Sequence, residues 1–179
     1  MQVVLILDNI RSLYNVGSMF RTADGFGVEK IFLCGITGTP AQNGLKKVAL
    51  GAEHTVPWEH ARHTWRVVEK LQREGYDVVG LERTNGAMKI GKFHPSKKIA
   101  LVLGNEVRGL TPALQKRLDA TLEIPMVGKK ESFNVAVACG IALYALTTSV
   151  IPAPEPESRK LKTTTAELRP SLGWERWVR

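Results

Sequence analysis

Two stretches decide the fold expected for this chain, LVLGNEVRGL at residues 101–110 and IPMVGKKESFNVAVACGIALYAL at residues 124–146. A short apolar run leads into each loop, 99–103 in the first case and 121–124 in the second, and each run stops at a glycine or a proline. Buried strands stop in this way where they enter loops. Because ligands of open α/β sheets bind beyond the carboxyl ends of the strands, we expect a ligand site where these two loops begin.

The second stretch continues into an almost wholly apolar helix, predicted from Val135 to Leu146. Ser132 and Asn134 stand just before this helix, and both residue types are good helix caps. A helix that lacks a polar face is buried on all sides. We therefore expect this helix in the interior of the protein or at a subunit interface.

The rest of the chain alternates between strand and helix patterns. Apolar runs predict strands at 3–8, 31–34, 55–56 and 77–81, three-four spacing predicts helices after Asn15 and at 60–74, and 82–98 is predicted to be a loop. Asn15 is expected to cap the first of these helices. The alternation predicts an α/β fold with a mostly parallel sheet and helices on both faces.

The composition changes after Val150. Residues 151–158, IPAPEPES, are rich in proline and predict a stiff, extended linker. The segment that follows carries many charged side chains together with Trp174 and Trp177, which could dock onto the domain or stack on bases. We therefore expect one domain at residues 1–150 and an extension at residues 151–179.

The overall composition indicates a globular protein with an anionic partner. No apolar run is long enough to span a bilayer, and the first residues lack the basic start of a signal peptide. We therefore expect a cytoplasmic protein with no membrane partner. The formal net charge of +8 favours nucleic acid, although charge alone does not separate RNA from DNA or from an indifferent basic surface.

The cysteines and histidines do not form a metal-binding pattern. Cys34 and Cys139 each lie in an apolar run, and neither belongs to a cluster with metal-ligand spacing. We expect two buried, reduced thiols and no bound metal. The chain also lacks a Walker A sequence, a G-x-G-x-x-G fingerprint after its first strand, and a G-x-S-x-G elbow. Nucleotide-dependent α/β enzymes and α/β-hydrolases are therefore disfavoured.

Three separated segments together resemble a known family. NVGSMFRTADGFG (15–27), LVLGNEVRGL (101–110) and IPMVGKKESFNVAVACGIALYAL (124–146) resemble the three motifs of the SpoU/TrmH family of RNA ribose 2′-O-methyltransferases, within the SPOUT superfamily. Their order and spacing match those of the family. The resemblance covers residues 1 to about 150 and leaves 151–179 outside.

The resemblance implies a Rossmann-like α/β fold whose C-terminal part forms a deep trefoil knot, and a homodimer with its active site at the interface. It implies S-adenosyl-L-methionine as the cofactor and tRNA or rRNA as the substrate. It assigns cofactor contacts, made largely through backbone atoms, to Leu81 and the loop after it, Gly104, Ile124, Met126 and Phe133.

The resemblance also assigns five residues to catalysis, with Arg21 as the principal one and Asn15, Glu106, Ser132 and Asn134 around it. A guanidinium rarely gives up its proton. We therefore expect Arg21 to stabilise the developing alkoxide and the adjacent phosphate, while solvent or a phosphate takes the proton. Glu106 could hold Arg21 or Asn15 in place through charge-assisted hydrogen bonds.

Plainer interpretations stay open at this point. Taken singly, Arg21 could be an ordinary solvated helix residue, Glu106 a partner in a loop salt bridge, and Ser132 and Asn134 simple caps. As a whole, the chain could be a catalytically inactive RNA-binding module of the same fold. The expected residue types at all five catalytic positions favour an enzyme.

Overall fold

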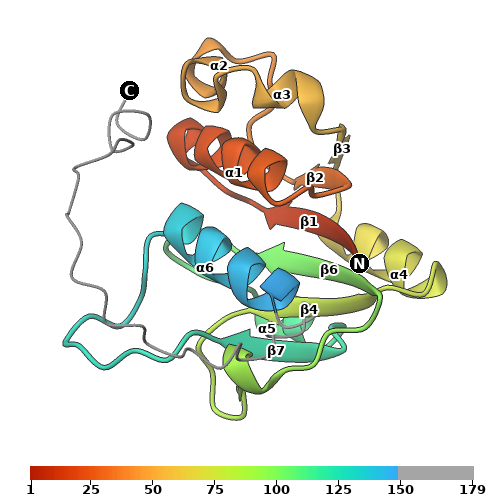
Figure 1. Cartoon of the computed structure of the whole chain (residues 1–179), viewed down its shortest axis with the longest axis vertical. Helices are drawn as coiled ribbons and strands as arrows, with labels where there is room; N and C mark the ends of the chain where they lie inside the picture. The colour runs from red at the N-terminus through yellow and green to blue at the C-terminus, as the bar shows by residue number, and fades with distance from the viewer. Residues whose placement is uncertain (149–179) are drawn as a thin grey trace, which may run out of the picture.

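The computed structural model describes residues 1–148, which form one sheet between two layers of helices (Figure 1). In chain order the elements are β1 (Gln2–Asp8), α1 (Leu13–Gly25), β2 (Lys30–Cys34), α2 (Asn43–Ala49), α3 (Ala52–Thr55), β3 (Trp58–Ala61), α4 (Thr64–Arg73), β4 (Asp77–Leu81), β5 (Met88–Lys89), the 3-10 turn η1 (Ile90–Lys92), β6 (Lys98–Leu103), α5 (Pro112–Gln115), β7 (Ala120–Glu123) and α6 (Val135–Thr148).

The strands form one sheet in the order β3-β2-β1-β6-β4-β7-β5, and every pair of neighbouring strands is parallel. β1 lies inside the sheet, where Leu5 pairs with Ile31 of β2 and with Leu101 of β6. All three side chains are fully buried. A continuous apolar run is what a strand covered on both faces requires, and the predicted parallel α/β sheet is confirmed.

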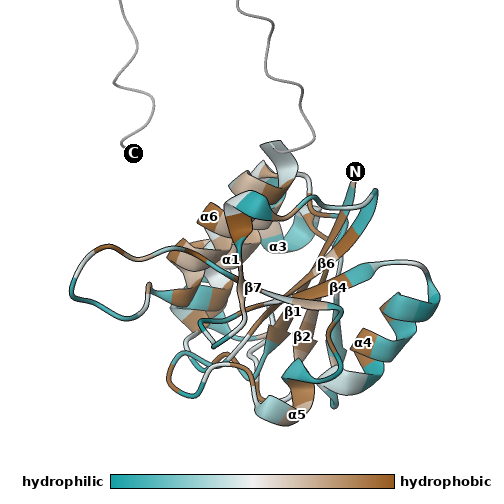
Figure 2. Cartoon of the chain, turned by 90° about the horizontal axis from the view of Figure 1, so that it is seen from below, coloured by the Kyte–Doolittle hydropathy of each residue, from teal (hydrophilic) through white to brown (hydrophobic). Residues whose placement is uncertain are grey.

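Helices cover both faces of the sheet, as predicted. Leu5 and Leu7 of β1 point to one face, where they join a core cluster that includes side chains of α1 and α6. Val4 and Ile6 point to the other face and join side chains of α4 and of the segment around α5. Figure 2 shows the apolar strands enclosed between these helices. The two-residue period of the strand therefore divides the core into two halves.

α6 is buried on one side only. Cys139, Ala142 and Leu143 lie in the core and the helix packs against α1, but Val137 is 52% exposed and Tyr144 is 62% exposed. The helix is thus at the surface of the protomer with an apolar outer side. The sequence left two locations open for this helix, the interior or a subunit interface, and its exposed side excludes a wholly interior position.

Both cysteines are buried free thiols, as predicted. Burial raises the pKa of the Cys139 thiol to about 12. Burial is also the largest cause that raises the pKa of the Cys34 thiol to about 12, with the nearby carboxyl groups of Asp8 and Glu59 adding to it. Both side chains therefore act as small apolar groups of the core.

The first helix begins earlier than predicted, because Asn15 is not its cap. Ser12 is the N-cap residue, and its Oγ accepts a hydrogen bond from the backbone N–H of Asn15 at 3.3 Å. Since a serine side chain satisfies this turn, the Asn15 side chain is left free to make contacts across the molecule.

The prediction for residues 55–61 was wrong. Residues Ala52–Thr55 are helical, the strand lies at Trp58–Ala61, and α4 starts at Thr64 instead of His60. The side chains of Trp58 and of the two residues after it are exposed, so no apolar pattern marks this strand. Backbone hydrogen bonding to β2 at the edge of the sheet decides its position.

The predicted loop 82–98 contains two short elements. β5 pairs with β7 through Met88 and Leu122, and η1 follows it directly. Ile90 of η1 is buried, and η1 lies against α6. This connection is therefore fastened to the last helix.

Some expectations concern residues that the structure does not describe. The predicted linker and extension at 151–179, together with the boundary at Val150, lie outside the described residues. Within residues 1–148, no helix is long and apolar enough to cross a membrane. In the same part of the chain, no group of His, Cys, Asp and Glu side chains is arranged to hold a metal ion.

The close packing of α1 on α2 yields a stability prediction. A Cβ at Gly17 would lie 2.8 Å from the carbonyl oxygen of Leu45 and 2.8 Å from the Cβ of Val48. Gly17→Ala should therefore force the helices apart and lower the free energy of unfolding by about 1–3 kcal/mol, measured by urea denaturation. Gly25→Ala, in the same helix with nothing within 4 Å, should leave stability unchanged or higher. Equal stability of the Gly17 variant and the wild type would contradict this packing.

Candidate functional site

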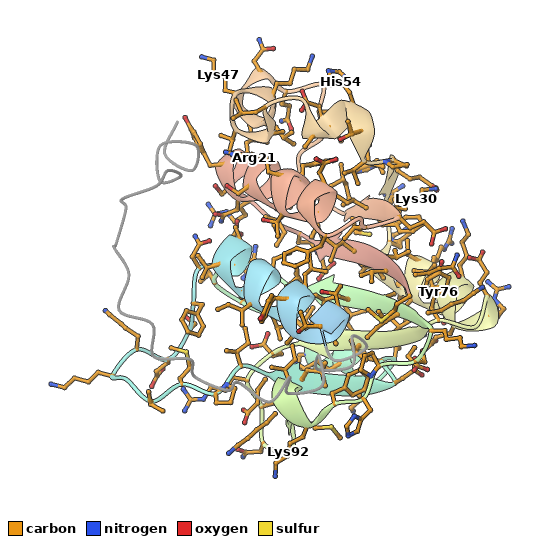
Figure 3. All side chains as sticks on the ribbon, in the orientation of Figure 1. Arg21, Lys30, Lys47, His54, Tyr76 and Lys92 are labelled. Carbon is orange, nitrogen blue, oxygen red and sulfur yellow. The ribbon has the colours of Figure 1, made fainter. Side chains whose placement is uncertain are left out.

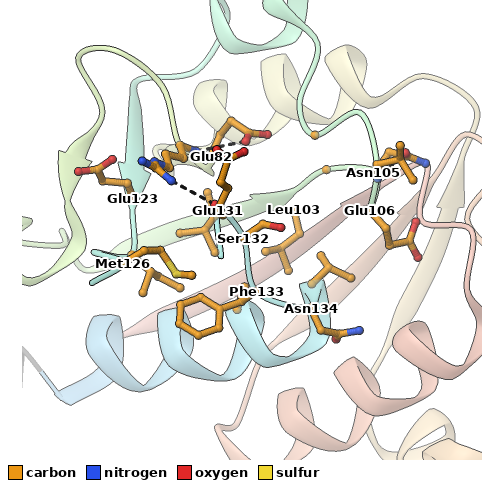
Figure 4. Close-up of a pocket in the computed structure, with 18 of the residues that line it drawn as sticks. Glu82, Leu103, Asn105, Glu106, Glu123, Met126, Glu131, Ser132, Phe133 and Asn134 are labelled. Carbon is orange, nitrogen blue, oxygen red and sulfur yellow. Dashed lines mark hydrogen bonds between the residues drawn. The ribbon is translucent and has the colours of Figure 1, made fainter. Parts of the chain in front are cut away.

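A cavity of about 490 Å³ opens beyond the carboxyl ends of β4, β6 and β7, where the start of α1 and the start of α6 also meet. Figure 4 shows the residues that line it. The lining residues come from the loops after these three strands and from both helix starts: Asn15, Leu81, Glu82, Arg83, Leu103, Gly104, Asn105, Glu106, Val107, Gly109, Glu123, Ile124, Met126, Glu131, Ser132, Phe133, Asn134, Val135 and Ala138.

The lining brings together most of the residues that the sequence singles out. All five expected cofactor residues line the cavity, and so do four of the five expected catalytic residues. The exception is Arg21. It is exposed on α1 and makes no hydrogen bond or ion pair with any residue of the described part of the chain.

A chain of hydrogen bonds links the three motifs. The Asn15 Nδ2 donates to Glu106 Oε1 at 3.1 Å, and the Asn134 Nδ2 donates to Asn15 Oδ1 at 3.1 Å. Asn15 thus uses both ends of its amide to join the loop after β6 to the start of α6. The amide orientation fits this network, since a carboxylate can only accept.

The carboxylate of Glu106 also fixes the segment before α1. Its Oε2 accepts from the backbone N–H of Arg11 at 3.0 Å, and its Oε1 accepts from the backbone N–H of Ser12 at 2.9 Å. Burial by itself opposes ionisation of Glu106, but these backbone hydrogen bonds and the one from Asn15 outweigh it and lower the pKa of the carboxyl group. Glu106 is therefore an ionised anchor that holds Asn15, and it makes no contact with Arg21.

Asn134 has two roles in the structure. Its Oδ1 accepts from the backbone N–H of Ala136 at 2.9 Å, so the residue caps α6 as predicted, while its Nδ2 reaches Asn15. Ser132 is exposed at the cavity and makes no hydrogen bond with the residues that the structure describes. The plain interpretation of Asn134 as only a cap is therefore incomplete.

The loop after β6 is held rigid from both sides. A Cβ at Gly104 would lie 2.5 Å from the carbonyl carbon of Gly109, so only glycine lets the loop fold back on itself. Gly109 adopts a φ of +63°, and the neighbouring backbone N–H of Leu110 donates to Glu82 Oε2 at 2.8 Å. The Asn105 Nδ2 donates to the backbone oxygen of Asn9 at 2.8 Å and ties the loop to the end of β1.

Sequence reasoning missed an acidic set of lining residues. Glu82, Glu123 and Glu131 join Glu106 in the cavity, and Arg83 is the basic residue among the described lining residues. The Arg83 Nη1 donates to the backbone oxygen of Glu131 at 3.5 Å. Glu82 directly follows β4 and Glu123 ends β7, so their position at the carboxyl ends of parallel strands is the signal that could have found them.

Comparison with known proteins places this site in a family. Residues 2–144 match the model of the SpoU rRNA Methylase family. This chain belongs to that family. The three motifs of the sequence, the cavity and the hydrogen bonds between the motifs are thus features of a SpoU-family domain.

The relatives of this SpoU-family chain act on RNA. It is 34% identical over 142 residues to the 23S rRNA (guanosine-2′-O-)-methyltransferase RlmB of Coxiella burnetii, a match that covers 79% of this chain and 56% of that protein. The AdoMet-bound rRNA methyltransferase of Sinorhizobium meliloti superposes with a TM-score of 0.77 and 28% identity, over 84% of this chain and 57% of the other.

A shorter relative matches almost end to end. A structure concerned with the 2-OH methylation of C/U34 on tRNA superposes with a TM-score of 0.75 and 27% identity, over 83% of this chain and 95% of the other. By contrast, this chain spans only 56% of the length of RlmB. It spans 57% of the 23S rRNA (guanosine(2553)-2′-O)-methyltransferase RlmP of Bacillus subtilis, to which it is 34% identical over 143 residues.

The lowered pKa of Glu106 predicts a pH-dependent effect of Glu106→Gln. The pKa of the Glu106 carboxyl group in the folded state lies below its ordinary value of 4.5. The stability that the carboxylate contributes is therefore fully present above about pH 4.5 and is lost as the pH falls through the pKa of the folded state. At pH 7 the variant should unfold with a free energy lower by about 1–3 kcal/mol, and the difference should shrink towards pH 3. Urea unfolding at one fixed protein concentration measures this, and a difference that stays constant with pH would contradict the anchor role.

Proposed function

We propose that this SpoU-family chain transfers a methyl group from S-adenosyl-L-methionine to a ribose 2′-hydroxyl of tRNA or rRNA. The observation that carries the proposal is the hydrogen-bonded chain from Glu106 through Asn15 to Asn134, which joins residues of all three motifs at one cavity. The relatives support both kinds of substrate, because one acts on 23S rRNA and another structure concerns tRNA.

The charge of the cavity suits S-adenosylmethionine. In our proposal Leu81, Gly104, Ile124, Met126 and Phe133 hold the cofactor at the mouths of the three strand loops. The cofactor carries a sulfonium and an ammonium group, and the acidic lining favours a ligand with net positive charge. The AdoMet-bound relative from Sinorhizobium meliloti supports this cofactor.

Methyl transfer in this site depends on positioning. The ribose oxygen forms a bond to the methyl carbon while the bond from carbon to sulfur breaks, and the hydroxyl proton leaves to solvent or to a phosphate. The enzyme must hold the oxygen, the carbon and the sulfur in line, which supplies much of the rate. In our proposal Arg21 stabilises the negative charge that develops on the oxygen, and Ser132 and Asn134 shape the loop beside the methionine portion.

Arg21 would act from a second copy of the chain. Figure 3 labels Arg21 on α1, and the residue does not line the cavity of its own protomer. α1 packs against α6, whose outer side exposes Val137 and Tyr144. We therefore propose a homodimer in which the apolar side of α6 is buried and Arg21 of one protomer faces the cavity of its partner.

We also propose the knot and the location that the family resemblance implies. The segment between β7 and α6 touches the segment after β4, since Arg83 donates to the backbone oxygen of Glu131, and α6 lies against η1. These contacts bring the segment 82–98 against the C-terminal part of the chain, where the resemblance implies the knot. An RNA substrate and S-adenosylmethionine would place the protein in the cytoplasm.

Arg21→Ala tests the catalytic assignment. Because Arg21 is not among the residues proposed to hold the cofactor, the variant should bind S-adenosylmethionine with wild-type affinity by calorimetry and yet lose methyl transfer by at least about 100-fold. Arg21→Lys keeps the charge without the planar fork and should recover only part of the rate. A nearly unimpaired Arg21→Ala variant would remove Arg21 from the mechanism.

Mixing two inactive variants tests whether the site is shared. Ile124→Asp should block the cofactor cavity and keep Arg21, whereas Arg21→Ala keeps the cavity. Dimers reassembled from equal amounts of both should recover about a quarter of wild-type activity, since half of them are mixed and each mixed dimer has one complete site. No recovery from folded, reassembled dimers would show that Arg21 does not act across the interface.

Phe133→Ala tests the cofactor pocket. The ring is 41% exposed and lines the cavity, so its removal takes apolar contact from the ligand without opening the core. Calorimetry should show S-adenosylmethionine affinity weaker by about tenfold, with no large change in the unfolding midpoint. Val127→Ala, a substitution at an exposed residue of the same loop outside the lining, serves as the control. Unchanged affinity in the Phe133 variant would place the cofactor elsewhere.

A further inference from the structure

The face of the sheet that carries α4 has an exposed cluster of a tryptophan and two arginines. The Arg66 Cζ lies 5.2 Å from the ring centroid of Trp65, and the Arg117 Cζ lies 5.4 Å from it. The His63 ring lies 6.2 Å from the same ring at an interplanar angle of 32°. We call these four residues the Trp65 patch. It joins the start of α4 to the connection between α5 and β7.

Trp65 is the exposed member of a set of rings that carry cations on this face. Lysine side chains also lie over Phe32 and Tyr76, but these rings are 2% and 8% exposed and belong to the core beneath α4. Trp65 is 38% exposed. The lysines therefore cover the core, whereas the arginines on Trp65 cover a ring that already faces solvent.

The surroundings of the Trp65 patch are positively charged. Exposed basic residues crowd the same two segments, namely Arg62, Arg66, Lys70, Arg73, Lys116 and Arg117. The same segments hold three acidic residues: Glu69 pairs with Arg117 at 2.6 Å, Asp119 accepts from the backbone N–H of Val78 at 2.7 Å, and Glu74 is exposed. This surface therefore favours an anionic partner.

One guanidinium group of the patch, that of Arg66, is free to bind phosphate. Stacking on an aromatic ring holds a guanidinium in place and leaves its edge donors free. The Arg117 Nη1 donates a hydrogen bond to Glu69, whereas the Arg66 side chain donates to no residue of the described part of the chain. Arg66 thus presents preorganised N–H donors to solvent.

The Trp65 patch is separate from the methyl-transfer cavity. None of its residues lines the cavity, which opens beyond the carboxyl ends of β4, β6 and β7 beside the starts of α1 and α6. A second protomer packed on α6 would leave the α4 face open. The patch therefore shares no residue with the cavity proposed for the cofactor.

We propose that the Trp65 patch is a second RNA-binding surface, which holds the sugar-phosphate backbone of the RNA substrate away from the nucleotide that is methylated. The inference rests on the proposed function for the identity of the substrate. Arginine donors on the phosphates and the exposed Trp65 ring together provide the contacts that proteins use on RNA without reading its sequence.

Two matched substitutions test the Trp65 patch on the full chain with unfractionated tRNA and an rRNA fragment. Trp65→Ala should weaken RNA affinity by about fivefold or more in filter binding, without a change in net charge. Trp58→Ala is the control, because Trp58 is also 38% exposed but no cation of residues 1–148 lies over its ring. Arg66→Ala should weaken binding and reduce the slope of log affinity against log salt by about 1.

Kinetics separate this surface from the catalytic site. Trp65→Ala and Arg66→Ala should raise the KM for RNA, while kcat at saturating RNA and the affinity for S-adenosylmethionine stay at wild-type values. RNA affinity that is unchanged in both variants, or equally reduced by Trp58→Ala, would overturn the Trp65 patch and leave the proposed function standing. RNA binding that depends on the patch in a wild-type protein that transfers no methyl group would keep the patch and refute the proposed function.

Discussion

The rest of the site depends on the hydrogen bonds that the carboxylate of Glu106 accepts. This carboxylate accepts hydrogen bonds from the backbone of Arg11 and Ser12 and from the side chain of Asn15, and so it fixes the start of α1 against the loop after β6. Asn15 then passes the constraint to Asn134 at the start of α6. In the sequence, Glu106 lies 91 residues after Asn15 and Asn134 lies 119 residues after it. The hydrogen bonds hold all three at one cavity. An ionised acceptor suits this role, because hydrogen bonds to a charged group are stronger than those between neutral groups.

The sequence predicted the parts of the fold whose cause is local or periodic. The parallel sheet followed from continuous apolar runs such as 3–8 and 99–103, and α6 followed from its apolar composition. The edge strand at Trp58–Ala61 could not be predicted, because its side chains are exposed and its position is set by backbone pairing with β2. In the site, resemblance to a family located Asn15, Glu106 and Asn134, yet it left open which residue Glu106 would hold. Glu106 holds Asn15 because α1 begins directly after its cap, Ser12, and so directs the Asn15 amide towards the cavity.

The two sides of the sheet have different tasks in this account. On one side, α1 carries Arg21 and α6 has an apolar outer side, which we propose that a second protomer covers. On the other side, α4 packs its apolar residues on the sheet and turns arginines and Trp65 to solvent. In the proposed function, the side with α1 and α6 carries the chemistry and the side with α4 holds RNA.

The most direct test of the central claim is to find where the methyl group goes. The full chain would be incubated with S-adenosylmethionine that carries a labelled methyl group and with tRNA or rRNA from cells that lack this gene, and the nucleosides would then be analysed by mass spectrometry. The account predicts label on the ribose of a defined nucleotide, with the base unlabelled. Label on a base, or no label in either RNA from a folded protein that binds the cofactor, would contradict it.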